Sequence, residues 1–528
     1  MLLKKIEGEK IVENKEKLRY QIDWISTLIP FAFVFILFII FSLFPDYSKE
    51  LLNNIRNILG DKFGIYYAIL GIGTFLCSII IAFSKIGNIR LGDSEKPLYS
   101  NFKWGTMIFT STMAADILFY SFCEWALYAN EPYIEHLGGI QKWASTYPLF
   151  HWGPIAWSFY IILAVAFGFM LYVRKRNIQK FSEACRPVLG KRTDGKIGKV
   201  IDLIAIFALI SGVATTFSLA TPLISSAINH IFGLQLGTSL SIIILLMIVI
   251  VYTITVNFGM KAISKLANFC IYLFVTLLLY FLLLGGEARY ILETGLSSIG
   301  NLIQNFVGMA TWTDPLRETS FPQNWTFYYW AYWMVWCVAT PFFIGSISKG
   351  RSIKNVIFGG YGWGLAGTFT SFIILGNYGM AQQLKYGVDI SNSIQQGTEI
   401  SDVIVKIFET MPLQNLGLIL LIITMILFYA TTLDALTMVV SSYSYKKLEV
   451  GKEPAKRVKI FWSIVFIILP IALIFANNSM AQLQSISIIA AFPIGIAIIL
   501  IIVSFIKDAK RYINEKEQKN IDMDKEKN

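Results

Sequence analysis

Long apolar runs recur along nearly the whole chain, and they constrain its fold more than any other feature. About 20 helical residues cross the roughly 30 Å hydrocarbon core of a bilayer. Twelve stretches are long and apolar enough to do so: 25–45, 65–84, 105–129, 148–173, 200–228, 238–258, 267–285, 325–346, 355–379, 412–442, 459–476 and 483–506. We therefore expect an all-α integral membrane protein with twelve transmembrane helices, called spans 1 to 12.

The composition excludes a soluble protein of this length. Of the 528 residues, 55% are hydrophobic and only 15% are charged, whereas soluble domains carry far more charge. The net charge of +11 is concentrated in the segments after spans 4, 6, 8 and 10. From span 4 onwards this alternation follows the positive-inside rule and predicts a multi-pass plasma-membrane protein with both termini cytoplasmic. The early loops fit less clearly, since Lys49, Arg56 and Lys62 lie on the predicted outside. The basic excess thus indicates topology and no nucleic-acid partner.

The polar segments divide the chain into six consecutive parts. Residues 1–23 form a cytoplasmic N-terminal segment without the apolar region of a cleaved signal peptide, and 24–104 hold two peripheral spans and a loop. Residues 105–286 contain spans 3–7. Residues 287–324 contain an amphipathic helix at 290–310, which we expect on the outer interface. Residues 325–506 contain spans 8–12, and 507–528 form a charged cytoplasmic tail that we expect to be partly disordered, like the N-terminal segment.

Aromatic residues gather in span 8 at an unusual density. Eight of the twelve residues from Trp325 to Trp336 are aromatic, inside a segment without charge. Tyr329, Trp333 and Trp336 lie on one helical stripe, and span 4 places Trp152, Trp157 and Tyr160 on one half of its helix. Indole and phenol faces attract cations, and quaternary ammonium groups suit them best. Two facing stripes would form such a cage, while an interfacial aromatic belt or plain helix packing is the alternative.

Spans 3 and 10 carry polar groups at membrane depth. Asp116 lies near the middle of span 3 and Glu124 two turns further on; an acid at such depth normally faces a polar cavity. Asp116 could balance a substrate cation, carry a proton or bind Na⁺, and the alternative is a structural hydrogen bond to a neighbouring helix. In span 10, Thr431 and Thr432 precede Asp434, and their hydroxyls either bind Na⁺ or bond to their own helix. The candidate ion-coupling residues are Asp116, Met113, Thr431 and Thr432.

These segments together resemble the betaine/choline/carnitine transporter family over nearly the whole chain. The most specific match is W-T-D-P-L-R-E-T-S-F-P-Q-N-W-T-F-Y-Y-W-A-Y-W, followed by I-S-K-G-R; F-H-W-G-P-I-A-W-S-F-Y, S-L-A-T-P-L and S-F-I-K-D-A-K are similar to the carnitine/γ-butyrobetaine exchanger branch. The resemblance implies a LeuT-type core of two inverted repeats, spans 3–7 and 8–12, after two extra helices, and a homotrimer. It also implies an aromatic box at Trp152, Trp157, Tyr160, Trp333 and Trp336, with Tyr332 at a position that is commonly Trp.

The departures from this resemblance concern coupling. Na⁺-coupled members carry a glycine-rich G-M-G-I-G in span 3, and this chain has T-M-A-A-D at 112–116, which argues against an unwound span 3 and against Na⁺ coupling. Thr431, Thr432 and Asp434, however, look like the T-S-A-D of the Na⁺-coupled branch. In the exchanger branch an arginine stands in for sodium, and the aligned residue here is Ser264. The coupling ion, H⁺ or Na⁺, and exchange stay open.

Asp116 favours one substrate. Choline carriers of the family look similar in having Asp there, and choline is a bare cation whose charge a carboxylate would balance, whereas glycine betaine and carnitine bring their own carboxylate. We expect a secondary transporter for choline that works by alternating access and needs no cofactor, with carnitine, γ-butyrobetaine or glycine betaine as alternative substrates. A polytopic membrane enzyme would need a catalytic dyad or metal cluster, and none is visible. A channel would need rings of polar residues around a pore.

Overall fold

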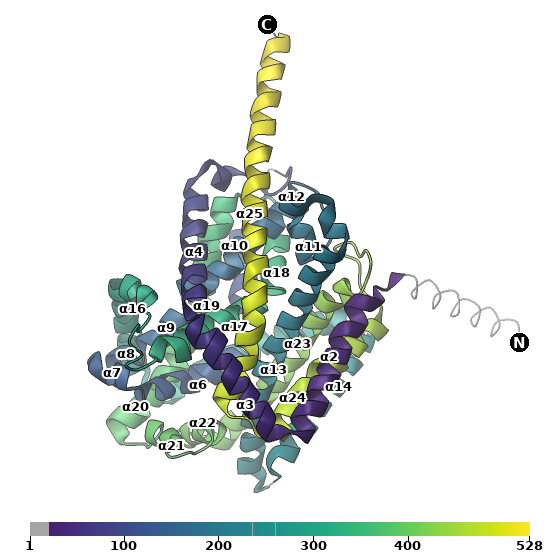
Figure 1. Ribbon diagram of the computed structural model, residues 1–528. Coiled ribbons are helices and arrows are strands. Elements are labelled where there is room, and N and C mark those ends of the chain that lie inside the picture. The colour runs from purple at the N-terminus through teal and green to yellow at the C-terminus, as the bar shows by residue number, and fades with distance from the viewer. Residues whose placement is uncertain (1–20, 95, 235, 259, 528) are drawn as a thin grey trace, which may run out of the picture.

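The computed structural model describes residues 21–94, 96–234, 236–258 and 260–527, and this part of the chain is almost entirely helical (Figure 1). Nine helices are long and apolar enough to cross a membrane, and two bent helix pairs raise the count of candidate spans in the described residues to eleven. Most of the N-terminal segment, residues 1–20, lies outside the described residues. The length and apolar composition of these helices therefore support the prediction of an integral membrane protein.

The helix bounds follow the predicted spans closely. Spans 1 and 2 are α2 (Trp24–Leu43) and α4 (Gly64–Phe83). Span 4 is α9 (Thr146–His151) followed by α10 (Pro154–Tyr172), and spans 5 to 7 are α13 (Lys196–Phe232), α14 (Gly237–Phe258) and α15 (Met260–Leu279), the last extended by η4 (Tyr280–Leu284). Spans 10 to 12 are α23 (Gln414–Tyr443), α24 (Lys456–Phe475) and α25 (Met480–Lys527).

The predicted ninth span, 355–379, is helical but is not among the eleven candidates. It consists of α19 (Ile353–Ser371), η6 (Phe372–Gly376) and α20 (Asn377–Tyr386). Glycines and polar residues lower its hydropathy, so the total of twelve spans stays a prediction. Short helices fill the connections: α3 (Pro45–Arg56), η1 (Asn57–Lys62), η2 (Lys85–Asn88), α7 (Pro132–His136), α8 (Ile140–Trp143), α11 (Phe181–Ala184), α12 (Arg186–Leu189), η3 (Gly190–Asp194), α21 (Ser391–Gln395) and α22 (Ile400–Glu409).

Spans 3 and 8 are both broken near the middle. Span 3 consists of α5 (Asn101–Thr110) and α6 (Ala115–Ala129), bent by 66°. Span 8 consists of η5 (Pro322–Thr326) with α17 (Phe327–Trp336), then α18 (Thr340–Ile347) after a bend of 57°. These are the first helices of the two predicted repeats, although the LeuT-type arrangement itself stays a prediction.

The expectation that span 3 lacks an unwound segment was wrong. Residues 111–114 leave the helix without any glycine, and Ala114 is fully extended (φ −138°, ψ 159°). The hydroxyls of Ser111 and Thr112 donate to the carbonyls of Ile108 and Phe109, at 2.6 and 2.7 Å. Such local side-chain bonds compete with helix continuation, so these hydroxyl residues favour the break in span 3 without glycine.

The predicted amphipathic helix is α16 (Ala288–Thr311). One of its faces is buried against the helix bundle, through residues that include Ile291, Ser298 and Leu302. The opposite face exposes Leu292, Leu296, Ile303 and Val307, which are spaced on one stripe. The helix is therefore confirmed, and its place on the outer membrane interface stays a prediction.

The basic segments after spans 4, 8 and 10 lie on one face of the molecule. The backbone of Val450, after span 10, donates to Asn177, after span 4, and the loop before span 3 pairs with Arg351 and Ile353. We call this side the basic face. Figure 1 places α11, α12 and the C-terminus toward one end of the molecule, while α20 to α22 lie at the other. The grouping agrees with the predicted alternation of loop charge.

The C-terminal helix α25 continues far beyond span 12 and projects from the helix bundle (Figure 1). The expectation of a partly disordered tail was therefore wrong up to Lys527. Arg511 pairs with Glu515 one helical turn away, and Gln518 donates to Asp522. Such pairs stabilise a polar helix, which the mixed charge pattern of the tail did not reveal.

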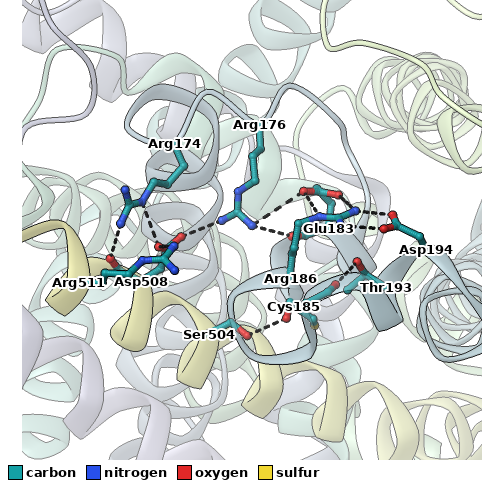
Figure 2. A network of polar contacts seen from close by, with 11 residues as sticks. Arg174, Arg176, Glu183, Cys185, Arg186, Thr193, Asp194, Ser504, Asp508 and Arg511 are labelled. Carbon is teal, nitrogen blue, oxygen red and sulfur yellow. Dashed lines mark hydrogen bonds and ion pairs between the residues drawn. The ribbon is translucent and has the colours of Figure 1, made fainter. Parts of the chain in front are cut away.

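A buried carboxylate fastens α25 to the basic segment after span 4 (Figure 2). Asp508 is 2% exposed and accepts hydrogen bonds from Arg174 and Arg176, each at 3.0 Å, and from Arg511 at 2.7 Å. Arg174 also reaches Glu515 at 2.8 Å, and this contact lowers the pKa of Glu515. We call this set of residues the Asp508 clamp.

Removing the charge of the clamp should destabilise the protein. Replacing Asp508 with asparagine removes the negative charge that three guanidinium groups share. Losing one partner of a buried ion pair lowers the free energy of unfolding by about 3 kcal/mol. We expect a clear drop in the melting temperature of the detergent-solubilised protein, followed by tryptophan fluorescence. Glu517→Gln removes the exposed pair with Lys85 and should change stability by less than about 1 kcal/mol. Equal melting temperatures for the two variants would contradict the clamp.

The segment before span 8 is ordered by one carboxylate. Asp314 is buried and accepts hydrogen bonds from the backbone N–H groups of Glu318, Thr319 and Ser320 at 3.0, 2.9 and 2.7 Å. Burial by itself would raise the pKa of Asp314, but these donors outweigh it and the pKa is lowered. The W-T-D-P-L-R-E-T-S motif thus fixes the loop that leads into the broken span.

Candidate functional site

One cavity of about 660 Å³ lies between the two broken spans, and the candidate substrate-binding and ion-coupling residues line it, with Tyr329 of the predicted stripe as the exception. Its lining includes Met113, Asp116, Trp152, Trp157, Tyr160, Tyr332, Trp333, Trp336, Thr431 and Thr432. The rings of spans 4 and 8 thus face a shared void and not the membrane surface. Their role in binding stays a prediction, while their convergence is a property of the structure.

Trp333 is the centre of the aromatic part of this cavity. Its ring centroid lies 4.6 Å from that of Tyr160 and 5.5 Å from that of Trp157. Trp152 lies 5.7 Å from Trp333 on its other side, and Tyr332 joins the group to Trp336 at 6.3 Å. Rings from α17, from α10 and from Trp152 at the end of α9 therefore form a continuous wall, whose faces and edges can surround a cation.

Two glycines allow the indoles to take these positions. A Cβ atom at Gly364 of α19 would lie 2.6 Å from the ring of Trp157, and one at Gly212 of α13 would lie 3.1 Å from the ring of Trp336. The first distance is a clash and the second is tighter than ordinary contact. The backbones of α19 and α13 therefore support the cage directly, and larger side chains at these positions would push the indoles into the cavity.

Asp116 reaches the cavity from the start of α6. Because span 3 breaks at residues 111–114, the carboxylate lies in the first turn of the new helix, where the helix dipole stabilises negative charge. Its Oδ1 accepts from the backbone N–H of Ile117 at 2.9 Å, and Oδ2 accepts from the Tyr332 hydroxyl at 2.6 Å. Because the Tyr332 hydroxyl donates its hydrogen bond to Asp116, it accepts one from the Thr216 hydroxyl, at 2.5 Å.

Two of the polar side chains of span 10, Thr431 and Asp434, already have hydrogen-bond partners. The hydroxyl of Thr431 donates to the backbone of its own helix, at 3.0 Å to Phe428 and 3.1 Å to Leu427. Asp434 accepts from the buried ammonium of Lys459 on α24 at 2.8 Å. Thr432 lines the cavity beside them. The side chain of Ser264 lies outside the described part of the chain.

Tyr329 shares the helical stripe of Trp333 and Trp336 on α17, but it does not line the cavity, so the prediction that this whole stripe forms the cage was wrong. Its ring is fully buried and stacks on His151, with centroids 5.0 Å apart and planes 16° apart. The 100° spacing places Tyr329 between Trp333 and Trp336 on the helix, but the ring of His151 from α9 covers it. It belongs to a second layer of groups behind Trp152.

That second layer contains Glu124, which is fully buried. Its Oε2 accepts from the indole N–H of Trp152 at 2.6 Å, and its Oε1 contacts the Tyr128 hydroxyl at 2.5 Å. Tyr128 also lies 2.6 Å from His151 Nδ1, and His151 Nε2 lies 2.9 Å from the Thr326 hydroxyl. Glu124, which the sequence left without an assigned role, thus holds one ring of the cage.

The cavity extends toward the basic face, because Gln179 and Val450, from the segments after spans 4 and 10, form part of its lining. On the opposite side rings pack against one another, including the buried rings of Tyr128 and Trp325 at 5.0 Å and the half-buried rings of Tyr133 and Trp312 at 3.8 Å. Among the described residues, these rings lie between the cavity and the side opposite the basic face.

Sequence reasoning missed the residues that support the cage. Thr216, Gly212 and Gly364 lie on helices that showed no chemical motif, and Lys459 lies on span 11, near the start of an apolar run. The lysine in span 11 was a usable signal, because charged side chains within a membrane span usually pair with another charged group or a backbone carbonyl. The glycines gave no such signal, since their importance depends on which indole packs against them.

Comparison with known proteins identifies related chains. The family described as BCCT, betaine/carnitine/choline family transporter, matches residues 25–514. A probable glycine betaine transporter of Desulfitobacterium hafniense (strain Y51) is 30% identical over 484 residues, covering 89% of this chain and 95% of that protein. A carnitine transporter of Acinetobacter baumannii (strain ATCC 19606) is 28% identical over 426 residues, covering 80% of this chain and 76% of that protein.

Proposed function

Because the chain belongs to the betaine/carnitine/choline transporter family, we propose that it is a secondary transporter whose preferred substrate is choline or another quaternary ammonium cation without a carboxylate. The members of this family are transporters, and the protein is not an enzyme. The proposal places the trimethylammonium group among Trp152, Trp157, Tyr160 and Trp333, with Tyr332, Trp336 and Asp116 completing the site.

The charge of the cavity lining is the observation that carries this proposal. Among the described residues that line the cavity, the charged side chains are Asp116 and Asp434, and no Lys or Arg is among them. Asp434 is already paired with Lys459, whereas Asp116 has hydrogen-bond donors but no ion pair in the described structure. A buried carboxylate of this kind is balanced by a bound cation, and a zwitterion would bring a second carboxylate without a basic partner.

Zwitterionic substrates are the second candidate. The two relatives carry the names glycine betaine transporter and carnitine transporter, and the aromatic wall suits any trimethylammonium group. The Tyr332 and Thr216 hydroxyls could bond to a substrate carboxylate once Asp116 is protonated. Competition among choline, glycine betaine, carnitine and γ-butyrobetaine for one radiolabelled ligand ranks these possibilities, and choline is expected to compete best.

Alternating access is the proposed mechanism. The substrate site lies between two helices broken at mid-span, as in transporters built from inverted repeats, and it has access from the basic face, which we assign to the cytoplasm of a plasma-membrane protein. Rocking of the α5/α6 and α17/α18 pairs would separate the rings on the side opposite the basic face and close the cavity toward the basic face. We also propose a homotrimer, on the family resemblance alone.

For coupling, we propose that sodium is not bound at span 10. Lys459 already pairs with Asp434, so a cation bound there would have to compete with an ammonium group. H⁺ or the membrane potential would then drive uptake, with Asp116 as the candidate coupling residue that can carry a proton.

Uptake into proteoliposomes tests function and coupling together. We expect saturable choline uptake with counterflow, and an initial rate that changes less than about twofold when K⁺ replaces Na⁺ at a clamped potential. Counterflow distinguishes a carrier from a channel, whose flux would rise with concentration without saturating. A tenfold loss of rate on removal of Na⁺ would refute the coupling proposal and leave the carrier assignment intact.

A further inference from the structure

The buried layer behind Trp152 contains two ionisable side chains that the proposed function does not use. Glu124 and His151 are both fully buried, and Tyr128 lies between them. Glu124 Oε1 and His151 Nδ1 are 3.7 Å apart. We propose that Glu124, Tyr128 and His151 form a proton-binding site linked through Trp152 to the cavity, so that a quaternary ammonium cation and this proton oppose each other's binding. The inference rests on the proposed function.

The first argument is electroneutrality. Glu124 as carboxylate with neutral His151 has one negative charge, and a single added proton removes it. An unbalanced charge in the protein interior is costly. With an empty cavity, the network therefore retains one proton, either on Glu124 or on His151 as an ion pair with Glu124.

The second argument is hydrogen bonding, since the network is satisfied in every one of these states. With Glu124 ionised, Tyr128 donates to it, His151 Nδ1–H donates to Tyr128, and Thr326 donates to Nε2 when the ring is neutral. With Glu124 protonated, each bond reverses, and His151 Nε2–H donates to Thr326. Both hydroxyls can donate or accept. A proton can thus enter, move or leave without leaving a buried polar group unpaired.

The third argument connects this network to the substrate. Trp152 lines the cavity, and its indole N–H donates to Glu124 Oε2 at 2.6 Å. Among the indoles of the cage, the N–H groups of Trp157, Trp333 and Trp336 have no partner in the part of the chain that is described. A negative charge on Glu124 therefore acts on one ring of the cage in particular. It attracts a cation on the cavity side of that ring.

The linkage follows by balance. When a free cation binds in the cavity, the protonated network loses its proton and becomes ionised. That proton passes to the solvent, so one cation is bound for each proton released. By reciprocity, lowering the pH weakens cation binding by the same free energy that cation binding uses to expel the proton. Affinity for the cation should thus rise with pH while the network titrates.

Other groups near the network have to be separated from it. On α6 these are Asp116, Tyr120 and Cys123; the neighbouring elements contribute Tyr147, Tyr328, Tyr329, Arg56 and Glu131. Asp116 is the main competitor, because it also faces the cavity and is an acid. Arg56 is turned to the carbonyls of Ala481 and Asn324.

Titration calorimetry of the purified full-length protein tests the proposal. Choline is titrated at one pH in phosphate and in Tris, whose ionisation heats differ, and the difference in heat gives the protons released. We expect release with the unmodified protein and with Asp116→Asn, and none with Glu124→Gln, in which the amide oxygen still accepts from Trp152. Release that survives in Glu124→Gln, or disappears only in Asp116→Asn, would overturn the proposal.

Two further measurements keep the test decisive. If Glu124→Gln does not fold, the affinity of the unmodified protein across pH and the His151→Gln variant take its place; a pH-independent affinity of the unmodified protein would refute the site. Failure of choline, glycine betaine and carnitine all to bind would instead refute the proposed function. Binding without proton release would refute this inference alone.

Discussion

Replacing Trp333 with alanine should weaken the binding of choline about 30-fold, because a desolvated cation–π contact is worth about 2 kcal/mol. Trp333 lies between rings of span 4, with its centroid 4.6 Å from that of Tyr160 and 5.5 Å from that of Trp157. Its removal therefore opens the wall of the cage as well as deleting one π face. Trp336→Ala should also weaken binding, but less, since Trp336 contacts the cage only through Tyr332 at 6.3 Å.

The measurement is equilibrium binding of radiolabelled choline to purified protein. Trp333→Phe keeps an aromatic face and should retain part of the affinity. Trp24→Ala is the matched control, since Trp24 is an exposed tryptophan on α2, and it should bind as the unmodified protein does. If both Trp333→Ala and Trp336→Ala bind normally while the protein remains folded, the substrate lies elsewhere.

Replacing Asp116 with asparagine should weaken choline binding about 100- to 1,000-fold, since a carboxylate about 4–5 Å from a cation contributes about 3–4 kcal/mol at an effective dielectric constant near 20. Asparagine preserves the volume and can still accept from Tyr332, so the loss reports charge. The affinity for glycine betaine should change much less, because the variant also removes the repulsion between the carboxylate of glycine betaine and that of Asp116. The ratio of choline to glycine betaine affinity should therefore fall, and Asp116→Gly should lower it further.

Competition binding with both ligands measures this ratio directly. Asp402→Asn removes an exposed acid on α22 and should leave the ratio unchanged. Tyr332→Phe removes the hydroxyl that bonds to Asp116 and tests whether orientation of the carboxylate matters in addition to its charge. An unaltered ratio in Asp116→Asn would remove the role assigned to Asp116 and return the preference to the zwitterions.

Much of the candidate site was predictable, because each of its residues is unusual for a membrane span. Carboxylates and stacked indoles at membrane depth have few structural uses, so Asp116, Trp152, Trp157, Tyr160, Trp333 and Trp336 could be named from residue type and helical spacing alone. Tyr329 shows the limit of that reasoning. The helical spacing puts it within reach of the stripe, yet α9 packs over it and removes it from the cavity.

The break in span 3 shows a second limit. Glycine content suggested a continuous helix, but hydroxyls at Ser111 and Thr112 bond to the preceding turn and an extended Ala114 redirects the chain. The break also affects the candidate site, because it places the carboxylate of Asp116 at a helix N-terminus. Motif comparison could report the missing glycines but not the alternative route to the same bend.

The sequence alone determined that this chain is a helical membrane protein with aromatic rings and an acid at mid-membrane, since hydropathy and residue type act locally along each span. Only the tertiary structure decided which groups meet. Lys459 neutralises Asp434, Glu124 holds Trp152, and Asp508 fastens the C-terminal helix, and each pair joins residues from different segments. Such pairings depend on how helices pack against one another, and distances of this kind are not encoded in the spacing of any one helix.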